Sequence, residues 1–264
     1  MQVSFPMYPS PAAAQERFWL GLKKWFDYFG VKHAPDFLSH PLDLHRHWAI
    51  PDVLLSQTCG YPLVTELNNK VQLIGAFAYA AEGCHGVSYR SFLVARRQDQ
   101  AAHLSEFRDR KVAYNSLQSQ SGYNCLRAQI APLAINGHFF AHAIESGSHH
   151  HSIEMVVNHD ADLAAIDCVS FAFFERNHPD LMAQIKVIGK TRLTPGLPLI
   201  TNIHSSNHTI IAIQKALNAT MTDDSLIETR QALMITDFQA LPIDAYDICL
   251  DMQRQAISLG VDSL

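Results

Sequence analysis

The stretch Tyr114–Arg127 reads YNSLQSQSGYNCLR, and it joins a short strand-like run to a segment with helical spacing of apolar residues. Ser119, Gln120 and Ser121 fall where that helix begins. A helix start carries unsatisfied backbone N–H groups and a partial positive charge. Gly122, which has no Cβ, lets the backbone come close to a ligand. The stretch therefore predicts an oxyanion cradle, in which hydroxyl and amide groups bind the ligand. The alternative is an ordinary helix cap.

A second stretch repeats this pattern. It reads ESGSHH over residues 145–150, where a strand ends and Ser148 or Gly147 caps a helix beside His149. A third buried strand ends in Asp167, which either caps a helix or meets a hydroxyl, proton or amine of a ligand. The ends of neighbouring strands in an α/β sheet face one crevice, so we expect these side chains to lie near the first cradle.

Polar side chains also follow strands in the first part of the chain. Tyr8 comes after the first strand-like run, and Gln57 and Thr58 end a buried strand over 53–57, shortly before Tyr61. A tyrosine ring can wall a pocket while its hydroxyl donates a hydrogen bond. We expect these four residues to contribute to a ligand site.

The segment 103–195 alternates strand and helix, which predicts βαβ units on a mostly parallel sheet. Two crossings rich in polar, proline or glycine residues bracket this insert, near 95–102 and 194–198. Two lobes joined by two crossing strands form a hinged cleft that can close around a ligand. The predicted organisation is an α/β chain with lobe 1 over 1–96 plus 196–264 and lobe 2 over 97–195.

Composition excludes several classes of partner. The chain has 264 residues, 48% apolar and 17% charged, with a net charge of −5 and no basic block, so no nucleic acid is expected as a partner. The apolar runs are too short to span a bilayer, so we expect no membrane insertion. No basic n-region followed by an apolar stretch follows Met1, so no secretion signal is visible. Either the chain stays in the cytoplasm or a leader lies outside this sequence.

No motif points to a metal, a cofactor or nucleophilic catalysis. The five cysteines are scattered without C-x-x-C spacing, which favours buried thiols; pairing of Cys59 with Cys84 in an oxidising compartment stays open. The 15 histidines include no HExxH pattern, and we expect no metal site. The G-x-S-x-G, G-x-G-x-x-G and P-loop fingerprints are absent, so we expect no cofactor.

Six blocks together carry a resemblance to a known family. The sequence resembles the phosphate/phosphite/phosphonate substrate-binding proteins of ABC transporters, the PhnD-like family, over roughly residues 3 to 202. The blocks occur in that family's order and spacing. They are LLSQTCGYPL at 54–63, YRSFLVARR at 89–97, NSLQSQSGYNCLR at 115–127, ESGSHHHSI at 145–153, ADLAAIDCVS at 161–170 and PGLPLIT at 195–201.

The resemblance implies a type II periplasmic-binding-protein fold with two lobes that close on an oxyanion. It implies that Ser119 and Ser121 hold phosphonyl oxygens and that His149 and Asp167 join them. Gln120 stands where many members have a smaller hydroxyl residue or Asn, so one donor differs. The complete set of expected ligand-binding residues is Tyr8, Gln57, Thr58, Tyr61, Ser119, Gln120, Ser121, Gly122, Ser148, His149 and Asp167.

The expected function is non-enzymatic binding of phosphate, phosphite or a phosphonate by a monomer, with an ABC permease as the partner and the periplasm as the compartment. Asp167 is expected to accept a proton from the ligand and to disfavour sulfate, which has none to offer near neutral pH. The alternative from another class is a cytoplasmic enzyme or ligand sensor on the same fold, with Cys59 or His149 recruited for chemistry.

Overall fold

The computed structural model describes residues 1–264, and the chain divides into two compact units. Unit 1 comprises Met1–Ser88 and Pro195–Ala245. Unit 2 comprises Tyr89–Thr194 and Tyr246–Leu264. Both units are therefore built from two separate pieces of the chain.

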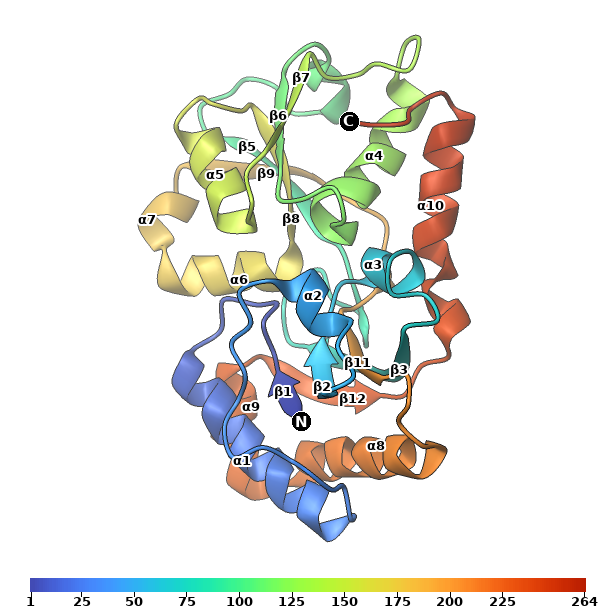
Figure 1. Cartoon of the computed structure of the whole chain (residues 1–264). Coiled ribbons are helices and arrows are strands. Elements are labelled where there is room, and N and C mark those ends of the chain that lie inside the picture. Colours follow the sequence, from blue (N-terminus) through green and yellow to red (C-terminus); the bar gives the residue numbers. More distant parts are fainter. The chain divides into compact units, whose positions relative to one another are not determined.

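The expectation that all of 196–264 belongs to lobe 1 is wrong for the C-terminal segment. The chain returns to unit 2 at Tyr246. There helix α10 (Asp247–Ser258) buries Cys249, Met252 and Ala256 and packs against α4 (Cys125–Ile130) (Figure 1). The amphipathic spacing of α10 shows that the helix buries one face. The spacing does not show which sheet that face covers.

Unit 1 contains a mixed five-stranded sheet. Strand β1 runs parallel to β2, whereas β11 is antiparallel to both of its neighbours and β12 is antiparallel to β3. Strands β2 and β11 are buried along their whole length, which explains their nearly continuous apolar sequences. The order across the sheet is β1 (Gln2–Ser4), β2 (Val53–Gln57), β11 (Pro198–Asn202), β3 (Val71–Tyr79) and β12 (Ile235–Gln239).

Helices α1 (Ala12–Tyr28) and α8 (Asn207–Thr222) pack side by side and enclose the unit 1 core (Figure 1). Helix α1 buries Phe18, Leu22 and Phe26, the face that its sequence spacing predicts. The remaining helices of this unit are α2 (Leu44–Trp48), α3 (Gly60–Val64) and α9 (Ile227–Ala232), with 3₁₀ turns at Asp224–Leu226 and Ile243–Tyr246, the last residue of which belongs to unit 2.

Unit 2 contains a second five-stranded sheet. Strand β6 is parallel to both β7 and β8, and β5 is antiparallel to both β8 and β9. The sheet is therefore parallel except for β5, which enters from the chain crossing rather than from a βαβ unit. The order is β7 (His142–Glu145), β6 (Lys111–Tyr114), β8 (Leu163–Asp167), β5 (Ser91–Arg96) and β9 (Ile185–Lys190). Strands β4 (Ser88–Tyr89) and β10 (Thr194–Pro195) form a separate pair.

The helix expected over 121–133 is divided into three parts. A π-helical turn covers Gln120–Asn124, α4 follows, and a 3₁₀ turn covers Ala131–Leu133. The strand expected over 139–145 begins only at His142, because Phe139 and Phe140 are buried in the core ahead of it. The other helical elements of this unit are α5 (His149–Val157), α6 (Cys168–Asn177), α7 (Pro179–Met182) and a 3₁₀ turn at Leu104–Phe107.

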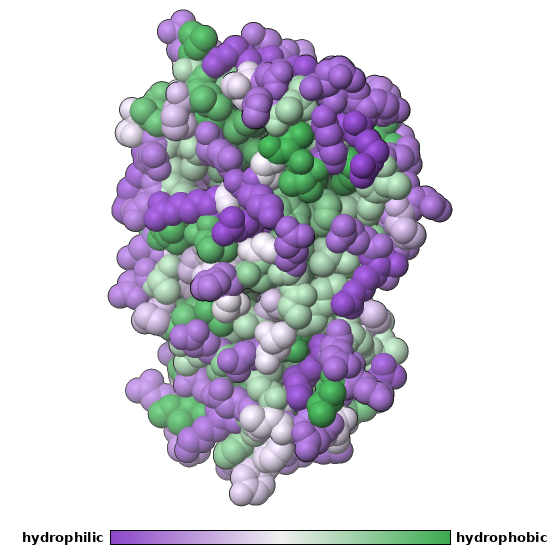
Figure 2. All heavy atoms as spheres, turned by 180° about the vertical axis from the view of Figure 1, so that it is seen from behind, coloured by the Kyte–Doolittle hydropathy of each residue, from purple (hydrophilic) through white to green (hydrophobic).

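None of the helices is both long enough and apolar enough to cross a membrane. On the face that Figure 2 shows, polar side chains predominate and the most apolar residues lie in small separate groups. Four of the five cysteines are buried, and Cys84 is partly exposed.

Gly75 in β3 tests the packing of the unit 1 sheet. Its φ is +151°, and a Cβ there would lie 2.3 Å from the carbonyl oxygen of Gln239. We expect Gly75→Ala to lower the free energy of unfolding by about 2–3 kcal/mol, because a backbone atom in a paired strand cannot move aside. Gly189→Ala is the matched control, since its Cβ would meet only Leu93, at 3.5 Å. Equal urea midpoints for the two variants would contradict this account of the sheet.

Candidate functional site

The π-helical turn begins as the sequence predicts, with Ser119 as its N-cap. The Oγ of Ser119 accepts a hydrogen bond from the backbone N–H of Gly122 at 2.9 Å. The carbonyl of Ser119 accepts from the N–H of Asn124, five residues on, at 2.9 Å. The earliest N–H groups of a helix have no acceptor within it, and π-helical turns occur frequently at functional sites. The turn therefore presents amide donors and hydroxyls on one side.

Ser121, His149 and Asp167 come together although three different elements supply them. The Oγ of Ser121 lies 3.0 Å from Nε2 of His149, and Oδ2 of Asp167 lies 3.2 Å from the same nitrogen. The other oxygen of Asp167, Oδ1, accepts from the N–H groups of Val169 and Ser170 and so caps α6. Asp167 thus has the helix-cap role that its position allowed, and its contact with a ligand stays a prediction.

The protonation of His149 follows from these contacts. A carboxylate oxygen only accepts, so the contact with Asp167 assigns a ring proton to Nε2. Burial lowers the pKa of His149 below its usual value, while the Asp167 carboxylate and the Ala165 carbonyl act in the opposite direction. Burial is the largest of these influences, so the ring is neutral around pH 7.

Gly122 allows the turn to pack against its neighbours. A Cβ at this position would lie 1.9 Å from Oδ1 of Asn115 and 3.2 Å from Cε1 of His149. Any larger residue would therefore displace the imidazole or the Asn115 amide. Glycine is required here for the close approach of Asn115 and His149, and the expected approach of a ligand to Gly122 stays a prediction. Asn115 is a neighbour of the site that local sequence reasoning missed.

Ser91 is a second missed residue. Its Oγ donates to the carbonyl oxygen of Ser121 at 2.9 Å, and its backbone pairs with Asp167 across strands β5 and β8. Ser91 thereby connects the π-helical turn to the strand that carries the acid. The only signal in the sequence is the polar Ser91 within an otherwise apolar strand, and its partners are at least 30 residues away.

The side chain of Gln120 points away from the predicted cradle. It is fully buried, and its Nε2 donates to Sγ of Cys125 at 3.1 Å and to Sδ of Met252 at 3.3 Å. Its Oε1 accepts from Nδ2 of Asn124 at 2.8 Å. The side-chain amide of Gln120 is thus used within the core of unit 2.

Ser148 caps α5, with its Oγ accepting from the N–H of His151 at 3.1 Å. The preceding Ser146 bonds to the carbonyls of Tyr114 and Ser148 and to Oγ of Ser152. The second predicted helix start is therefore real. This helix start places His149 beside the π-helical turn, whereas the Ser148 hydroxyl caps α5.

Three candidates of unit 1 lie around the ends of its strands. Nε2 of Gln57 donates to the hydroxyl of Tyr79 at 3.0 Å, and the rings of Tyr79 and Tyr8 meet edge to face with centroids 5.1 Å apart. Thr58 is completely buried, and its Oγ1 has no hydrogen-bond partner. Tyr61 lies further along, in α3. Tyr79, at the end of β3, is the member of this group that sequence reasoning missed.

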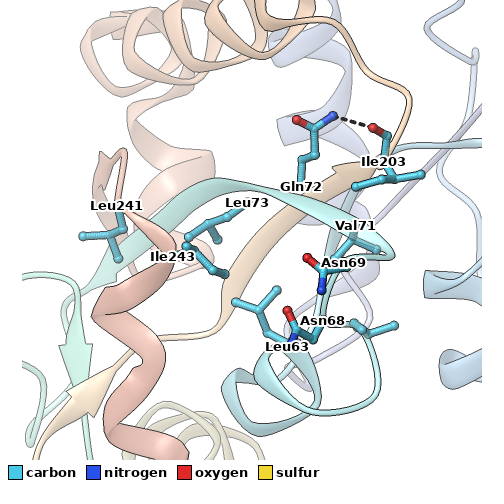
Figure 3. A pocket seen from close by; sticks show the side chains of 10 residues that line it. Leu63, Asn68, Asn69, Val71, Gln72, Leu73, Ile203, Leu241 and Ile243 are labelled. Carbon is cyan, nitrogen blue, oxygen red and sulfur yellow. Dashed lines mark hydrogen bonds between the residues drawn. The ribbon is translucent and has the colours of Figure 1, made fainter.

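A separate pocket of about 360 Å³ lies on unit 1 and contains none of the predicted site residues (Figure 3). Its walls are mostly aliphatic, and the amide of Gln72 bonds across it to the carbonyl of Ile203 at 2.9 Å. The lining residues are Leu63, Leu67, Asn68, Asn69, Val71, Gln72, Leu73, Ile203, Leu241 and Ile243. No group of three or more potential metal-ligating side chains gathers anywhere in the structure.

Two discontinuous α/β units, each built on a mixed five-stranded sheet, define a type II periplasmic-binding protein. Solved structures share this fold. One is a binding-protein component of an ABC phosphonate transporter (PA3383) from Pseudomonas aeruginosa, with a TM-score of 0.74 at 17% identity, covering 98% of this chain and 89% of that one.

Two further structures are similar at low sequence identity. PhnD1 from Prochlorococcus marinus in complex with methylphosphonate has a TM-score of 0.74 at 12% identity, covering 96% of this chain and 98% of that one. XAC2383 from Xanthomonas citri bound to ATP has a TM-score of 0.71 at 13% identity, covering 98% of both chains. No curated protein sequence matches this chain.

The family is established by a match that spans most of the chain. The model of the family described as "ABC transporter, phosphonate, periplasmic substrate-binding protein" matches residues 52–246. This chain belongs to that family. Its members are the substrate-binding components of ABC transporters, whose partners are a small-molecule ligand and a permease.

The buried imidazole of His149 makes stability depend on pH. Because the folded state favours the neutral ring, the unfolded state binds the extra proton more readily, and stability is lost as pH falls below the ordinary histidine value of about 6.5. We expect His149→Gln to reduce this loss, measured as urea midpoints between neutral and mildly acidic pH in the ligand-free protein. Burial also lowers the pKa of His47 in unit 1, so part of the loss remains in the variant. An unchanged slope in His149→Gln would show that the ring is not held neutral.

Proposed function

We propose that this chain binds a small phosphorus oxyanion, namely phosphate, phosphite or a phosphonate, and presents it to an ABC permease. The observation that carries the proposal is the π-helical turn, where the hydroxyls of Ser119 and Ser121 lie 3.4 Å apart and His149 joins Ser121. Membership of the phosphonate-binding family and the methylphosphonate bound by the similar PhnD1 support the same ligand class.

In our proposal, neutral donors make the direct contacts with the ligand. A buried anion must replace the hydrogen bonds it made with water, and N–H or O–H groups that converge on its oxygens do so without a paired cation. In our proposal the backbone N–H groups of Gln120 and Ser121 and the hydroxyls of Ser119 and Ser121 bind the tetrahedral oxygens. The Oγ of Ser119 already accepts from Gly122, so its O–H is directed outward as a donor.

We infer that Asp167 acts on the ligand through His149. Its two oxygens are occupied by Val169 and Ser170 on one side and by His149 on the other. This arrangement orients the imidazole, whose Nε2 proton is directed at Asp167 and Ser121. It replaces the simpler expectation that Asp167 accepts a ligand proton directly.

For unit 1 taken by itself, we propose Tyr8, Gln57, Thr58 and Tyr61 as ligand-binding residues. Thr58 supports this because its buried hydroxyl has no partner in the protein. An enzymatic role for Ser121 and His149 is not favoured. In a nucleophilic triad the acid and the serine contact different nitrogens of the imidazole, whereas here both contacts meet Nε2.

Isothermal titration calorimetry and thermal shift with phosphate, phosphite, methylphosphonate, aminoethylphosphonate and sulfate test the proposal. At about 100 times its dissociation constant, a true ligand stabilises the native state by about 2.7 kcal/mol. We expect at least one phosphorus oxyanion to do so and sulfate to bind more weakly.

Ser121→Ala should weaken the binding of that ligand by about 1–3 kcal/mol, because a buried anionic oxygen loses a donor. Ser206→Ala is the control; it removes a hydroxyl that caps α8 in unit 1, and it should leave affinity unchanged. The proposal fails if no phosphorus oxyanion stabilises the protein. It also fails if Ser121→Ala and Ser206→Ala bind the ligand equally well.

A further inference from the structure

Arg127 is a buried cation whose partners carry no charge. Only 4% of this residue is exposed, and it takes part in no ion pair. Its Nη1 donates to the carbonyl of Asp262 at 2.8 Å, and its Nη2 donates to Oδ1 of Asn124 at 3.1 Å. The guanidinium lies over the ring of Tyr123, 5.4 Å from its centroid, and Nε has no hydrogen-bond partner. A desolvated guanidinium normally requires an anion nearby.

The nearest place for that anion is the π-helical turn. Asn124 belongs to this turn and contacts Arg127 directly, while its own N–H closes the turn onto the carbonyl of Ser119. Ser121 precedes Arg127 by six residues, which at a helical rise of 1.5 Å per residue corresponds to about 9 Å. Arg127 therefore lies on the C-terminal side of the turn, away from its first N–H groups.

Asn124 and α10 hold this cation in place. Nδ2 of Asn124 donates to the carbonyl of Cys249 and to Oε1 of Gln120, both at 2.8 Å. The Asn124 side chain is completely buried, and these bonds link the turn to α10. The C-terminal segment of the chain thus forms part of the support for the anion site.

We propose that Arg127 supplies the positive charge that compensates the bound oxyanion, acting from the C-terminal side of the π-helical turn rather than by contact. This inference rests on the proposed function. An interaction between charges grows with the charge of the ligand, whereas a purely structural contribution of Arg127 weakens every ligand equally. At an effective dielectric of about 20 and about 9 Å, each unit of ligand charge corresponds to roughly a twentyfold change in affinity.

The test uses methylphosphonate, or inorganic phosphate if it binds more tightly, because each changes from a monoanion to a dianion near neutral pH. Dissociation constants are measured by calorimetry below and above that ionisation for the wild type and Arg127→Met. We expect Arg127→Met to weaken binding roughly twentyfold for the monoanion and roughly four-hundredfold for the dianion. A change in the protonation of His149 that is common to both proteins cancels in the ratio. The titratable or charged residues on the elements packed around Arg127 are Tyr123, Cys125, Asp247, Cys249, Asp251, Arg254 and Asp262.

Arg108→Met is the matched control. Arg108 also lies over an aromatic ring, Phe139 at 5.1 Å, donates to a backbone carbonyl, that of Leu133, and forms no ion pair. Its replacement removes the same charge from the same unit without a contact to the turn, and it should leave affinity unchanged at both pH values. Arg127→Lys keeps the charge, and its affinity should stay within about threefold of the wild type at both pH values.

Circular dichroism shows whether each variant is folded. If Arg127→Met does not fold, Arg127→Gln replaces it, because the introduced glutamine amide can still bond Asn124. A wild-type to variant ratio that is the same below and above the ionisation overturns the inference. So does a loss in Arg127→Lys as large as that in the charge-removing variants. A wild type that binds no phosphorus oxyanion is a different outcome, since it refutes the proposed function itself.

Discussion

The arrangement of unit 2 depends on the contact that Ser121 and Asp167 share at Nε2 of His149. These residues stand at the start of the π-helical turn, at the start of α5 and at the end of β8. A neutral, buried imidazole can satisfy both partners only when the three elements are correctly spaced. The contact therefore holds two helix starts and one strand end in a fixed relation, as a site with preorganised donors requires.

Other elements of unit 2 hold the π-helical turn in place. Donors preorganised for an anion repel one another when no anion is present, so the turn must be held by other bonds. Ser91 bonds to it from β5, Asn124 ties it to α10, and Gln120 fills the space beside Met252 with an amide bonded to sulfur atoms. We interpret the return of the C-terminal segment to unit 2 as part of this support.

Local chemistry made the main features of the site predictable. A serine at a helix start, a glycine beside it and an acid at a strand end each have a preferred backbone position, and Ser119, Gly122 and Asp167 adopt those positions. The alternation of strands and helices likewise indicated a largely parallel sheet, and the family match supports the resemblance drawn from the six sequence blocks.

Other features depend on contacts between distant residues and were not predictable from local patterns. The side chain of Gln120 turns toward Met252, 132 residues further along the chain. Ser91 reaches Ser121 only because β5 pairs with β8. Helix α10 belongs to unit 2, although the spacing of its apolar residues does not indicate which unit it packs against. A π-helical turn differs from an α-helix by one residue in its hydrogen-bond span, a difference that the apolar periodicity of 121–133 does not record.

A crystal structure with methylphosphonate would test the central claim most directly, because it locates the phosphonyl oxygens relative to unit 2. We predict oxygens within hydrogen-bonding distance of the N–H groups of Gln120 and Ser121 and of the hydroxyls of Ser119 and Ser121. No guanidinium or ammonium group should contact the ligand. A phosphonyl group bound elsewhere, or one held directly by an arginine or lysine, would contradict the account of an anion site made of neutral donors.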